Sequence, residues 1–296
     1  MAKNILINFP TNLGDTIMGL PVLDRLKSNY PQAKITVIAS SATKEFLLAN
    51  NFIDEVVVFN KHWTNIQKIR FVLGLRGKYD LMADLKNSFL PVLLGISDHT
   101  PFFRKFPQDM HLKERYLSLV EPIAPEARNL HSQFIITGEN ESCWRREKIA
   151  KAVFIAGSSR NRFKRYPADL LCKAIEEIKS FAPVAILGQR DEREFYHSLL
   201  SMPGVIDLVG KTSMSEVYFL LKEYGRLLIS VDSGLLHLGS YLNLPILALF
   251  GPTDPCRYGP WSKQSVVLCP QSHNLTDISP QEIVASARRL LSNEET

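Results

Sequence analysis

The sequence predicts an α/β protein made of two doubly wound domains, and three observations lead to this prediction. Short apolar runs typical of buried parallel strands alternate with helical patterns along the 296 residues. The alternation pauses in the polar stretch 137–150 and then starts again, which predicts a domain boundary there. The length, with 45% hydrophobic residues, is sufficient for two packed cores. Two such domains would face each other across a cleft.

In the N-terminal half the pattern begins with an apolar run that is followed by the turn-rich segment 10–15. The next residues, 16–29, have apolar side chains at helical spacing and predict a helix. Further helices are expected at 42–50 and 64–75. The predicted strands of this half are 5–8, 35–39, 55–59 and 80–84.

The C-terminal half repeats the theme, with its first helix at 167–180. A final amphipathic helix is predicted at 280–291, and we expect it to pack back on the N-terminal domain. The predicted strands of this half are 152–156, 184–187, 205–209, 227–231 and 246–250. In sheets of this kind ligands bind outside the carboxyl ends of the strands, so the loops after those ends are where a site is expected.

Composition excludes several classes of protein. The four cysteines form no C-x-x-C pair, and no H-E-x-x-H appears, so neither a zinc site nor a disulfide framework is expected. A net charge of +5 favours anionic small molecules or an anionic membrane face over a nucleic-acid groove. The sequence has no stretch long and apolar enough for a membrane span and no signal peptide, which predicts a cytoplasmic chain.

The loop after the first strand contains Asn12-Leu-Gly-Asp15 and leads into a helix. Asp15 has two interpretations, a helix N-cap or a general base that activates a hydroxyl group. No G-x-G-x-x-G follows the strand, which removes the main support for a dinucleotide-dependent dehydrogenase.

The loop after the strand 152–156 begins with Gly157, Ser158 and Ser159 and then has four cations within six positions, the third of them Lys164. Backbone N–H groups, hydroxyls and cations together suit a diphosphate. The spacing is not that of a Walker P-loop. The alternative is a solvated basic surface loop.

The loop after the strand 227–231 is Asp232-Ser233-Gly234, directly at the start of a helix, and a rigid turn follows the next strand at 251–255. Free N–H groups and the positive end of the helix would face an anion there. His237 on the same helix has two interpretations, a packed core histidine or a functional one.

Together these segments resemble glycosyltransferase family 9, the ADP-heptose:lipopolysaccharide heptosyltransferases. The most specific part runs from Asp232-Ser-Gly-Leu-Leu-His-Leu to Phe250-Gly-Pro-Thr-Asp-Pro. The opening 5–15 and the stretch 87–96 are similar to the members that add the second heptose. The resemblance implies a GT-B fold, with an acceptor-binding Rossmann-like domain over 1–145 and a donor-binding one over 146–296.

The resemblance also implies an inverting, metal-independent transfer without a cofactor, in which Asp15 is the general base and Lys164 binds the diphosphate. By the same resemblance, Ser158 and Ser159 contact phosphate, and Asp232 binds hydroxyls of the donor sugar. The remaining residues with implied roles are Ser233 and Gly234 for the diphosphate, Glu192 for the ribose, and Asn12, Lys86, Arg104 and Arg115 for the acceptor.

The implied partners are ADP-heptose and a lipid A-core saccharide, with peripheral contact to the cytoplasmic face of the inner membrane and no nucleic acid. Three alternatives stay open at this point. The chain could use another nucleotide sugar or a protein acceptor, or it could be a non-catalytic nucleotide-binding module. A sugar-nucleotide epimerase is disfavoured because no acid/base set for the sugar is found.

Overall fold

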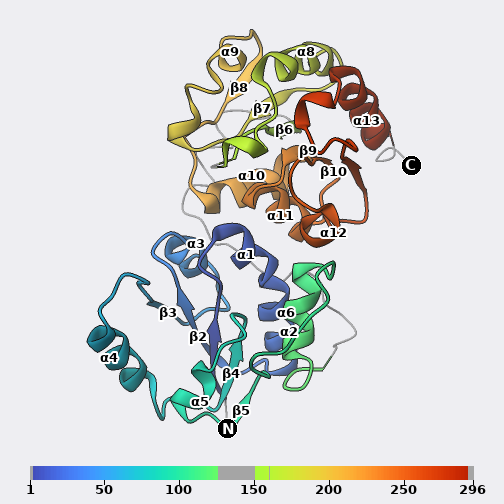
Figure 1. The fold of residues 1–296 in the computed structure, drawn as a ribbon. Coiled ribbons are helices and arrows are strands. Elements are labelled where there is room, and N and C mark those ends of the chain that lie inside the picture. Colours follow the sequence, from blue (N-terminus) through green and yellow to red (C-terminus); the bar gives the residue numbers. More distant parts are fainter. Residues whose placement is uncertain (1–2, 126–150, 160, 293–296) are drawn as a thin grey trace. The chain divides into compact units, whose positions relative to one another are not determined.

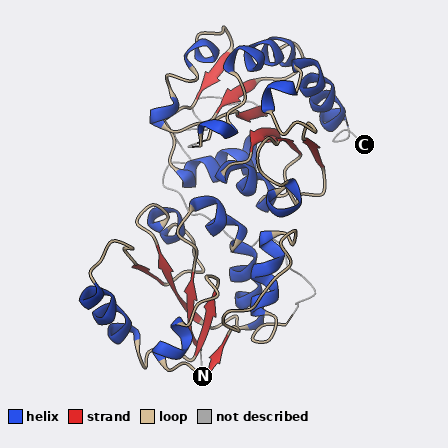
Figure 2. Cartoon of the chain, in the orientation of Figure 1, coloured by secondary structure: helices blue, strands red, loops and turns tan. Residues whose placement is uncertain are grey.

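The structure, a computed structural model, describes residues 3–125, 151–159 and 161–292. The chain divides into two compact units, residues 1–137 and 138–296. The predicted boundary at 137–150 lies outside the described residues, as does the division between 145 and 146. Each unit is a parallel sheet with helices packed on it, as the sequence predicts (Figures 1 and 2).

The N-terminal unit contains a five-stranded sheet in the order β3-β2-β1-β4-β5. All neighbouring strands are parallel. The strands are β1 (Asn4–Asn8), β2 (Lys34–Ala39), β3 (Glu55–Val58), β4 (Leu81–Asp84) and β5 (Asp98–His99). The four predicted strands are confirmed, and β5, only two residues long, is an addition. The helices are α1 (Leu13–Met18), α2 (Leu20–Asn29), α3 (Lys44–Leu48), α4 (Asn65–Leu75), α5 (Leu90–Leu94) and α6 (Leu112–Val120).

Helices cover both faces of this sheet. Leu6, Ile38 and Met82, from three neighbouring strands, form a core cluster with residues of α4 and α5. Side chains alternate between the faces along a strand, so Ile5 and Ile7, both fully buried, lie on the opposite face. There α1, α2 and α6 pack against one another, and α6 contacts β4.

The predicted helix 16–29 is wrong in one respect, because the structure has two helices in its place. The first begins at Leu13, and Gly19 ends it and precedes the second. Pro21, near the start of α2, has no N–H group to continue the hydrogen bonding of α1. A Cβ atom at Gly19 would come within 3.0 Å of side-chain atoms of Phe9 and Leu85, so this junction packs closely onto the loops after β1 and β4.

The C-terminal unit contains a six-stranded sheet in the order β11-β10-β9-β6-β7-β8, again with every pair parallel. The strands are β6 (Ala152–Ala156), β7 (Val184–Ile186), β8 (Val205–Asp207), β9 (Gly225–Val231), β10 (Ile246–Leu249) and β11 (Ser265–Leu268). The five predicted strands are confirmed, and β11 is an addition. The α-helices are α8 (Ala168–Ile178), α9 (His197–Leu200), α10 (Met214–Tyr224), α11 (Gly234–Tyr241), α12 (Pro255–Tyr258) and α13 (Pro280–Ser292). The 3-10 helices are η1 (Arg162–Lys164), η2 (Arg190–Glu192) and η3 (Leu275–Asp277).

The main core of this unit lies between the sheet and the helices α8 and α13. Leu227, Ile229 and Val231 of β9 belong to this core. Leu228, between them in the sequence, points to the other face, where α11 packs so closely that a Cβ at Gly239 would come within 2.5 Å of it. The helix α13 packs against α8, β9 and β10 of its own unit. Its predicted contact with the N-terminal domain stays a prediction.

Within the part of the chain that the structure describes, no helix has both the length and the apolar character needed to cross a membrane.

Candidate active site

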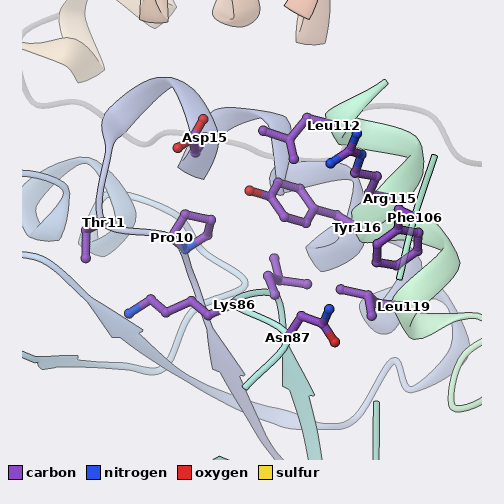
Figure 3. A pocket seen from close by; sticks show the side chains of 11 residues that line it. Pro10, Thr11, Asp15, Lys86, Asn87, Phe106, Leu112, Arg115, Tyr116 and Leu119 are labelled. Carbon is purple, nitrogen blue, oxygen red and sulfur yellow. The ribbon is translucent and has the colours of Figure 1, made fainter. Parts of the chain in front are cut away.

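A cavity of about 440 Å³ lies at the carboxyl edge of the N-terminal sheet. The chain leaves β1 toward one side of the sheet and β4 toward the other, so their carboxyl ends form a topological switch point, where open α/β sheets bind ligands. We call this space the α1–α6 cavity. Its lining residues are Pro10, Thr11, Asp15, Leu85, Lys86, Asn87, Phe106, Leu112, Arg115, Tyr116 and Leu119 (Figure 3).

Asp15 lines this cavity from α1, opposite side chains of α6 (Figure 3). It is the third residue of the helix, so its interpretation as the N-cap is wrong; Asn12 has that position. Asn12 donates its side-chain N–H to Asp15 Oδ2 at 3.3 Å. The sequence therefore places a carboxylate, oriented by a neighbouring amide, in the wall of a cavity that also contains apolar surface.

The wall formed by the loop after β4 is organised by a buried carboxylate that the sequence analysis missed. Asp84 is completely buried. Its oxygens accept hydrogen bonds from Asn8 Nδ2 at 2.7 Å, from the Lys86 N–H at 3.1 Å, and from the N–H and hydroxyl of Ser88 at 2.8 and 2.5 Å. These bonds fix the backbone that carries Lys86 and Asn87 into the cavity wall. A carboxylate at the end of a strand next to a switch point is the signal that could have found it.

Lys86 contributes a cation to the α1–α6 cavity. Its side chain is exposed to solvent, and its Nζ lies 5.5 Å from the centre of the Phe59 ring. Neighbouring protein atoms partly desolvate the ammonium group and lower the pKa of Lys86, and the nearby Asp84 carboxylate opposes this effect without cancelling it. The ammonium group therefore loses its proton more easily than that of an ordinary lysine.

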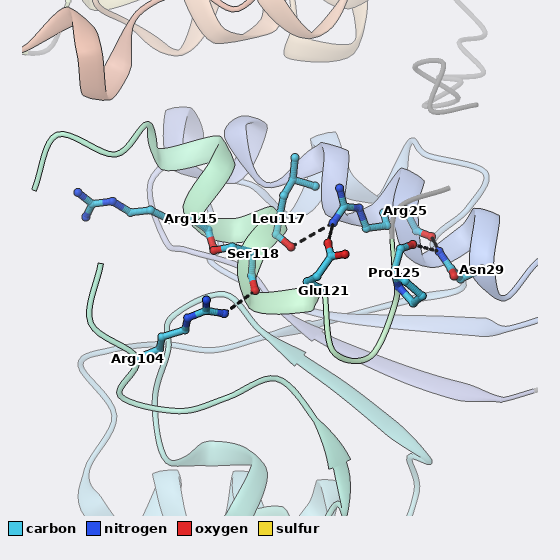
Figure 4. A network of polar contacts seen from close by, with 8 residues as sticks. All are labelled: Arg25, Asn29, Arg104, Arg115, Leu117, Ser118, Glu121 and Pro125. Carbon is cyan, nitrogen blue, oxygen red and sulfur yellow. Dashed lines mark hydrogen bonds and ion pairs between the residues drawn. The ribbon is translucent and has the colours of Figure 1, made fainter. Parts of the chain in front are cut away.

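The two arginines expected to bind an acceptor donate hydrogen bonds to backbone oxygens, and Figure 4 shows the bond from Arg104 to Ser118. Arg115 lines the cavity, and its guanidinium donates to the backbone oxygens of Pro107, Gln108 and Met110 at 2.6 to 2.9 Å. Arg104 is not among the lining residues, and it donates to Ser118 O at 2.8 Å. Both hold α6 and the segment before it in place.

A second polar network joins α6 to α2 and thereby fixes the cavity wall (Figure 4). Arg25, 5% exposed, donates to Glu121 Oε2 at 2.7 Å and to Leu117 O at 3.2 Å. Asn29 donates to Pro125 O at 3.1 Å. The wall that carries Arg115 is therefore anchored on both sides.

The residues expected to bind the donor gather at the carboxyl edge of the C-terminal sheet. Its switch point lies between β6 and β9, so the loops after these two strands meet although about 70 residues separate them. We call this region the β6–β9 edge. It brings together Ser158, Ser159 and Lys164 after β6 with Asp232, Ser233 and Gly234 after β9.

An ion pair joins the two loops. Lys164 Nζ lies 2.6 Å from Asp232 Oδ2, and the Asp232 side chain is only 6% exposed. His237 Nε2 lies 3.6 Å from the other Asp232 oxygen, and its buried ring stacks on Trp261. His237 is therefore packed, and it also borders the ion pair.

The cations of the basic loop around Lys164 have different surroundings. Lys164 ends η1, whose start is capped by the Asn161 side chain. Arg165 donates to Ser159 O at 2.9 Å and lies over the Phe195 ring, whereas Arg162 is exposed. Arg160 lies outside the described residues. The alternative of a uniform solvated loop does not hold, because Lys164 points to a buried carboxylate.

Three further residues of the β6–β9 edge have polar groups available for a ligand. The buried hydroxyl of Ser158 has no hydrogen-bond partner among the described residues. Ser233 is the N-cap of α11 but its side chain accepts no capping bond; its hydroxyl lies 3.2 Å from that of Ser230. The first N–H groups of α11, beginning at Gly234, therefore have no side-chain cap.

Glu192 lies at the end of η2, after β7, the neighbour of β6. It is 8% exposed, and its Oε2 accepts a hydrogen bond from the Gln189 N–H at 2.7 Å.

Among the described residues, no group of three or more His, Cys, Asp or Glu side chains is arranged to hold a metal ion.

Comparison with known proteins identifies the family. Residues 104–286, more than half of the chain, match glycosyltransferase family 9 (heptosyltransferase). This chain belongs to glycosyltransferase family 9. It is 26% identical to lipopolysaccharide heptosyltransferase 3 of Escherichia coli K12, over 94% of this chain and 95% of that protein. It is 25% identical to lipooligosaccharide heptosyltransferase 2 of Campylobacter jejuni, over 98% of each.

Solved structures of family 9 proteins have the same fold. E. coli ADP-heptose lipopolysaccharide heptosyltransferase II superposes with a TM-score of 0.78 at 24% identity, covering 99% of this chain and 100% of that one. A family 9 glycosyltransferase from Veillonella parvula gives a TM-score of 0.82 at 22% identity, covering 98% and 97%. The GT-B fold and the assignment of this chain as a glycosyltransferase are thus confirmed.

Proposed function

We propose that this family 9 enzyme transfers a heptose from ADP-heptose to the inner core of lipopolysaccharide, with inversion at the anomeric carbon and without a metal ion. The observation that carries the proposal is the Lys164–Asp232 ion pair at the β6–β9 edge, since it holds a cation where a diphosphate is expected. Relatives named lipopolysaccharide and lipooligosaccharide heptosyltransferases support the substrate class. E. coli WaaC, solved with ADP and with ADP-2-deoxy-2-fluoro heptose, supports the donor.

In this mechanism the acceptor sugar occupies the α1–α6 cavity with a hydroxyl at Asp15. The Asp15 carboxylate removes the hydroxyl proton while the oxygen attacks the anomeric carbon of the heptose. A correctly positioned general base contributes about 100- to 10,000-fold in rate. Lys86 and Asn87 line the same cavity and would bind polar or anionic groups of the acceptor.

The donor diphosphate occupies the β6–β9 edge. The bond between the anomeric carbon and the diphosphate oxygen breaks as the new bond forms, and ADP leaves with the electron pair. Lys164 exchanges Asp232 for the diphosphate and neutralises the charge that develops on it. Asp232 then accepts hydrogen bonds from hydroxyls of the donor sugar, and the Ser158 hydroxyl and the first N–H groups of α11 bind phosphate oxygens.

The acceptor in this proposal is a lipid A-core saccharide, and the enzyme is cytoplasmic and works peripherally on the inner membrane. A lipid-anchored acceptor requires the enzyme to meet the bilayer surface. Attraction of about 1 kcal/mol for each Lys or Arg near an anionic surface is sufficient for reversible contact.

The decisive experiment measures binding of ADP, UDP and GDP by calorimetry without metal, followed by transfer from ADP-heptose to a deacylated core saccharide lacking its outer heptose. Selective ADP binding and an inverted product linkage by NMR are expected, with unchanged turnover in the presence of a chelator. Preference for UDP or GDP would move the protein to another sugar. ADP binding without transfer to any saccharide or protein acceptor would favour a non-catalytic nucleotide-binding module.

A further inference from the structure

The N-terminal unit exposes a cluster of large apolar side chains beside the α1–α6 cavity. Phe89, Val92 and Leu93 lie on or next to α5, and Phe102 and Phe103 lie in the loop after β5. The Phe89 ring is 5.2 Å from Phe102 and stacks on Phe103 at 6.3 Å. Phe103 is 67% exposed and Leu93 52%. We call these five residues the apolar face.

The adjacent helix α4 continues this apolar character. It contacts α5, with which it shares a core cluster (Figure 1). Ile66, Ile69 and Leu73 are exposed on α4 at helical spacing, so they form one row on its surface. Contiguous exposed apolar side chains of this size mark interaction surfaces in soluble proteins.

The backbone holds the apolar face in place at a conformational cost. Phe103 has φ +52°, in the left-handed region that bulky side chains rarely adopt, and Asn87 has φ +54°, which asparagine tolerates. A backbone hydrogen bond joins the two loops that carry these residues, because the Phe103 N–H donates to Asn87 O at 3.3 Å. Strained backbone kept by surrounding bonds is a feature of functional positions.

The apolar face and the α1–α6 cavity share one residue. Asn87 lines the cavity, and its amide exchanges two hydrogen bonds with the backbone of Arg104, at 2.7 and 2.9 Å. Arg104 directly follows Phe103. A surface bound at the exposed rings is therefore bound next to the cavity wall.

Positive charge concentrates in the same part of the sequence. Residues 56–108 contain eight Lys or Arg and three Asp or Glu, a net charge of +5, which equals the net charge of the whole chain. Of the three acids, Asp84 is buried and Asp98 pairs with Lys3 at 3.0 Å. Segments 56–79, 85–97 and 99–108 contain no acidic residue.

We propose that the apolar face and exposed cations of the same segment, such as Arg70 and Lys105, dock on an anionic lipid bilayer, so that the α1–α6 cavity opens where a lipid-anchored sugar is available. Aromatic and aliphatic side chains with cations nearby suit the interface of an anionic membrane. The choice of lipid over a second copy rests on charge, since a two-fold contact would bring two faces of like charge together. The role for the cavity rests on the proposed function; the docking itself does not.

The experiment measures binding of the full chain to vesicles of phosphatidylglycerol and phosphatidylcholine, and to phosphatidylcholine alone, by flotation. The variant Arg70→Gln/Lys105→Gln removes two exposed cations and should weaken binding to anionic vesicles about 30-fold, or about 1 kcal/mol for each charge. The matched control Lys173→Gln/Lys263→Gln, exposed in the C-terminal unit, should bind as the unaltered chain does.

The apolar contribution is tested with Leu93→Ser/Phe103→Gly, in which Gly also relieves the strain at residue 103. About tenfold weaker vesicle binding is expected at equal melting temperature. Leu48→Ser, a leucine 48% exposed on α3, is the matched control. Unchanged vesicle binding in both test variants would overturn the proposal. So would dimers of the unaltered chain that Leu93→Ser/Phe103→Gly dissociates while vesicle binding persists.

Transfer to a deacylated, water-soluble acceptor separates the two proposals. All these variants should keep the kcat/KM of the unaltered chain with that acceptor and lose rate only with acceptor in anionic vesicles. Vesicle binding that depends on the apolar face, without any heptose transfer, would refute the proposed function and leave the docking surface standing. Heptose transfer without vesicle binding would refute the docking surface and leave the proposed function standing.

Discussion

Asp84 and Asp232 occupy matching places in two sheets of related topology, yet their surroundings differ. Asp84 ends β4, next to β1, and Asp232 follows β9, next to β6. Asp84 accepts hydrogen bonds from neutral groups, among them two backbone N–H groups, whereas Asp232 faces the ammonium of Lys164 at 2.6 Å. Neutral donors fixed in the backbone build a rigid loop, while a cation on a flexible side chain can be transferred to an anionic ligand. A carboxylate near the end of the strand beside the first strand thus fixes a loop in one unit and, as proposed, takes part in ligand binding in the other.

If only the N-terminal unit supplies the general base, Asp15→Asn should have the largest effect on activity. We expect kcat to fall about 1,000-fold, because the amide cannot accept the hydroxyl proton. Calorimetry should find ADP affinity within about twofold of the unaltered chain, since Asp15 lines the α1–α6 cavity and the donor is expected at the β6–β9 edge. Turnover near the normal rate would remove Asp15 as the base.

Asp84→Ala tests the constructive role. It leaves the Ser88 N–H and Asn8 amide without their acceptor, so the free energy of unfolding should fall by about 3 kcal/mol in urea titrations. Asp98→Ala, which removes a half-exposed carboxylate from the neighbouring strand, should cost less than about 1 kcal/mol. Equal losses in the two variants would contradict the special position of Asp84.

Lys164→Met tests the exchangeable cation. Loss of a charge-assisted bond to the diphosphate should weaken ADP binding about 30-fold, corresponding to about 2 kcal/mol. Arg162→Met, which removes an exposed cation from the same short helix, is the control and should bind ADP normally. Equal losses of ADP affinity in the two variants would contradict a specific role of Lys164 in binding the diphosphate.

Lys86 should give the smallest effect, visible as a pH dependence. Desolvation by neighbouring protein atoms lowers the pKa of Lys86, so as pH rises its positive charge disappears earlier than that of an ordinary lysine. The KM for an anionic acceptor should therefore rise severalfold on the alkaline side, and Lys86→Arg, always charged, should abolish that rise. An alkaline rise of equal size in Lys86→Arg would assign it to another group.

The strands could be predicted because parallel strands buried on both faces are continuous apolar runs, such as Ile5-Leu-Ile and Ala152–Ala156. The edge strand β5 is only Asp98–His99 and has no such pattern. The edge strand β11 contains the short apolar run 266–268, but it is only partly buried and the sequence analysis left it out. The break at Gly19 depends on contacts with Phe9 and Leu85, which helical periodicity does not contain.

Most residues of the candidate site could be predicted from the sequence, but the ion pairs and hydrogen bonds between them could not. The resemblance to family 9 predicts Lys164 and Asp232 at one donor site, but their direct contact depends on the sheet order. The position of Asp84 at a strand end was a usable signal, but its hydrogen bonds to Asn8 and Ser88 could not be read from the sequence. The bonds of Arg104 and Arg115 to backbone oxygens were equally invisible, since those oxygens belong to irregular segments.

The packing of α13 has a consequence for synthesis on the ribosome. Ile283, Ala287 and Leu290 complete the core between α8 and the sheet, so the C-terminal unit cannot close before residue 290 has left the exit tunnel. Among the described residues, the strands of the N-terminal unit end at residue 99 and its helix α6 ends at residue 120. The acceptor-binding half of the proposed enzyme can thus mature during translation, while a chain that stalls before α13 exposes an apolar surface that chaperones must cover.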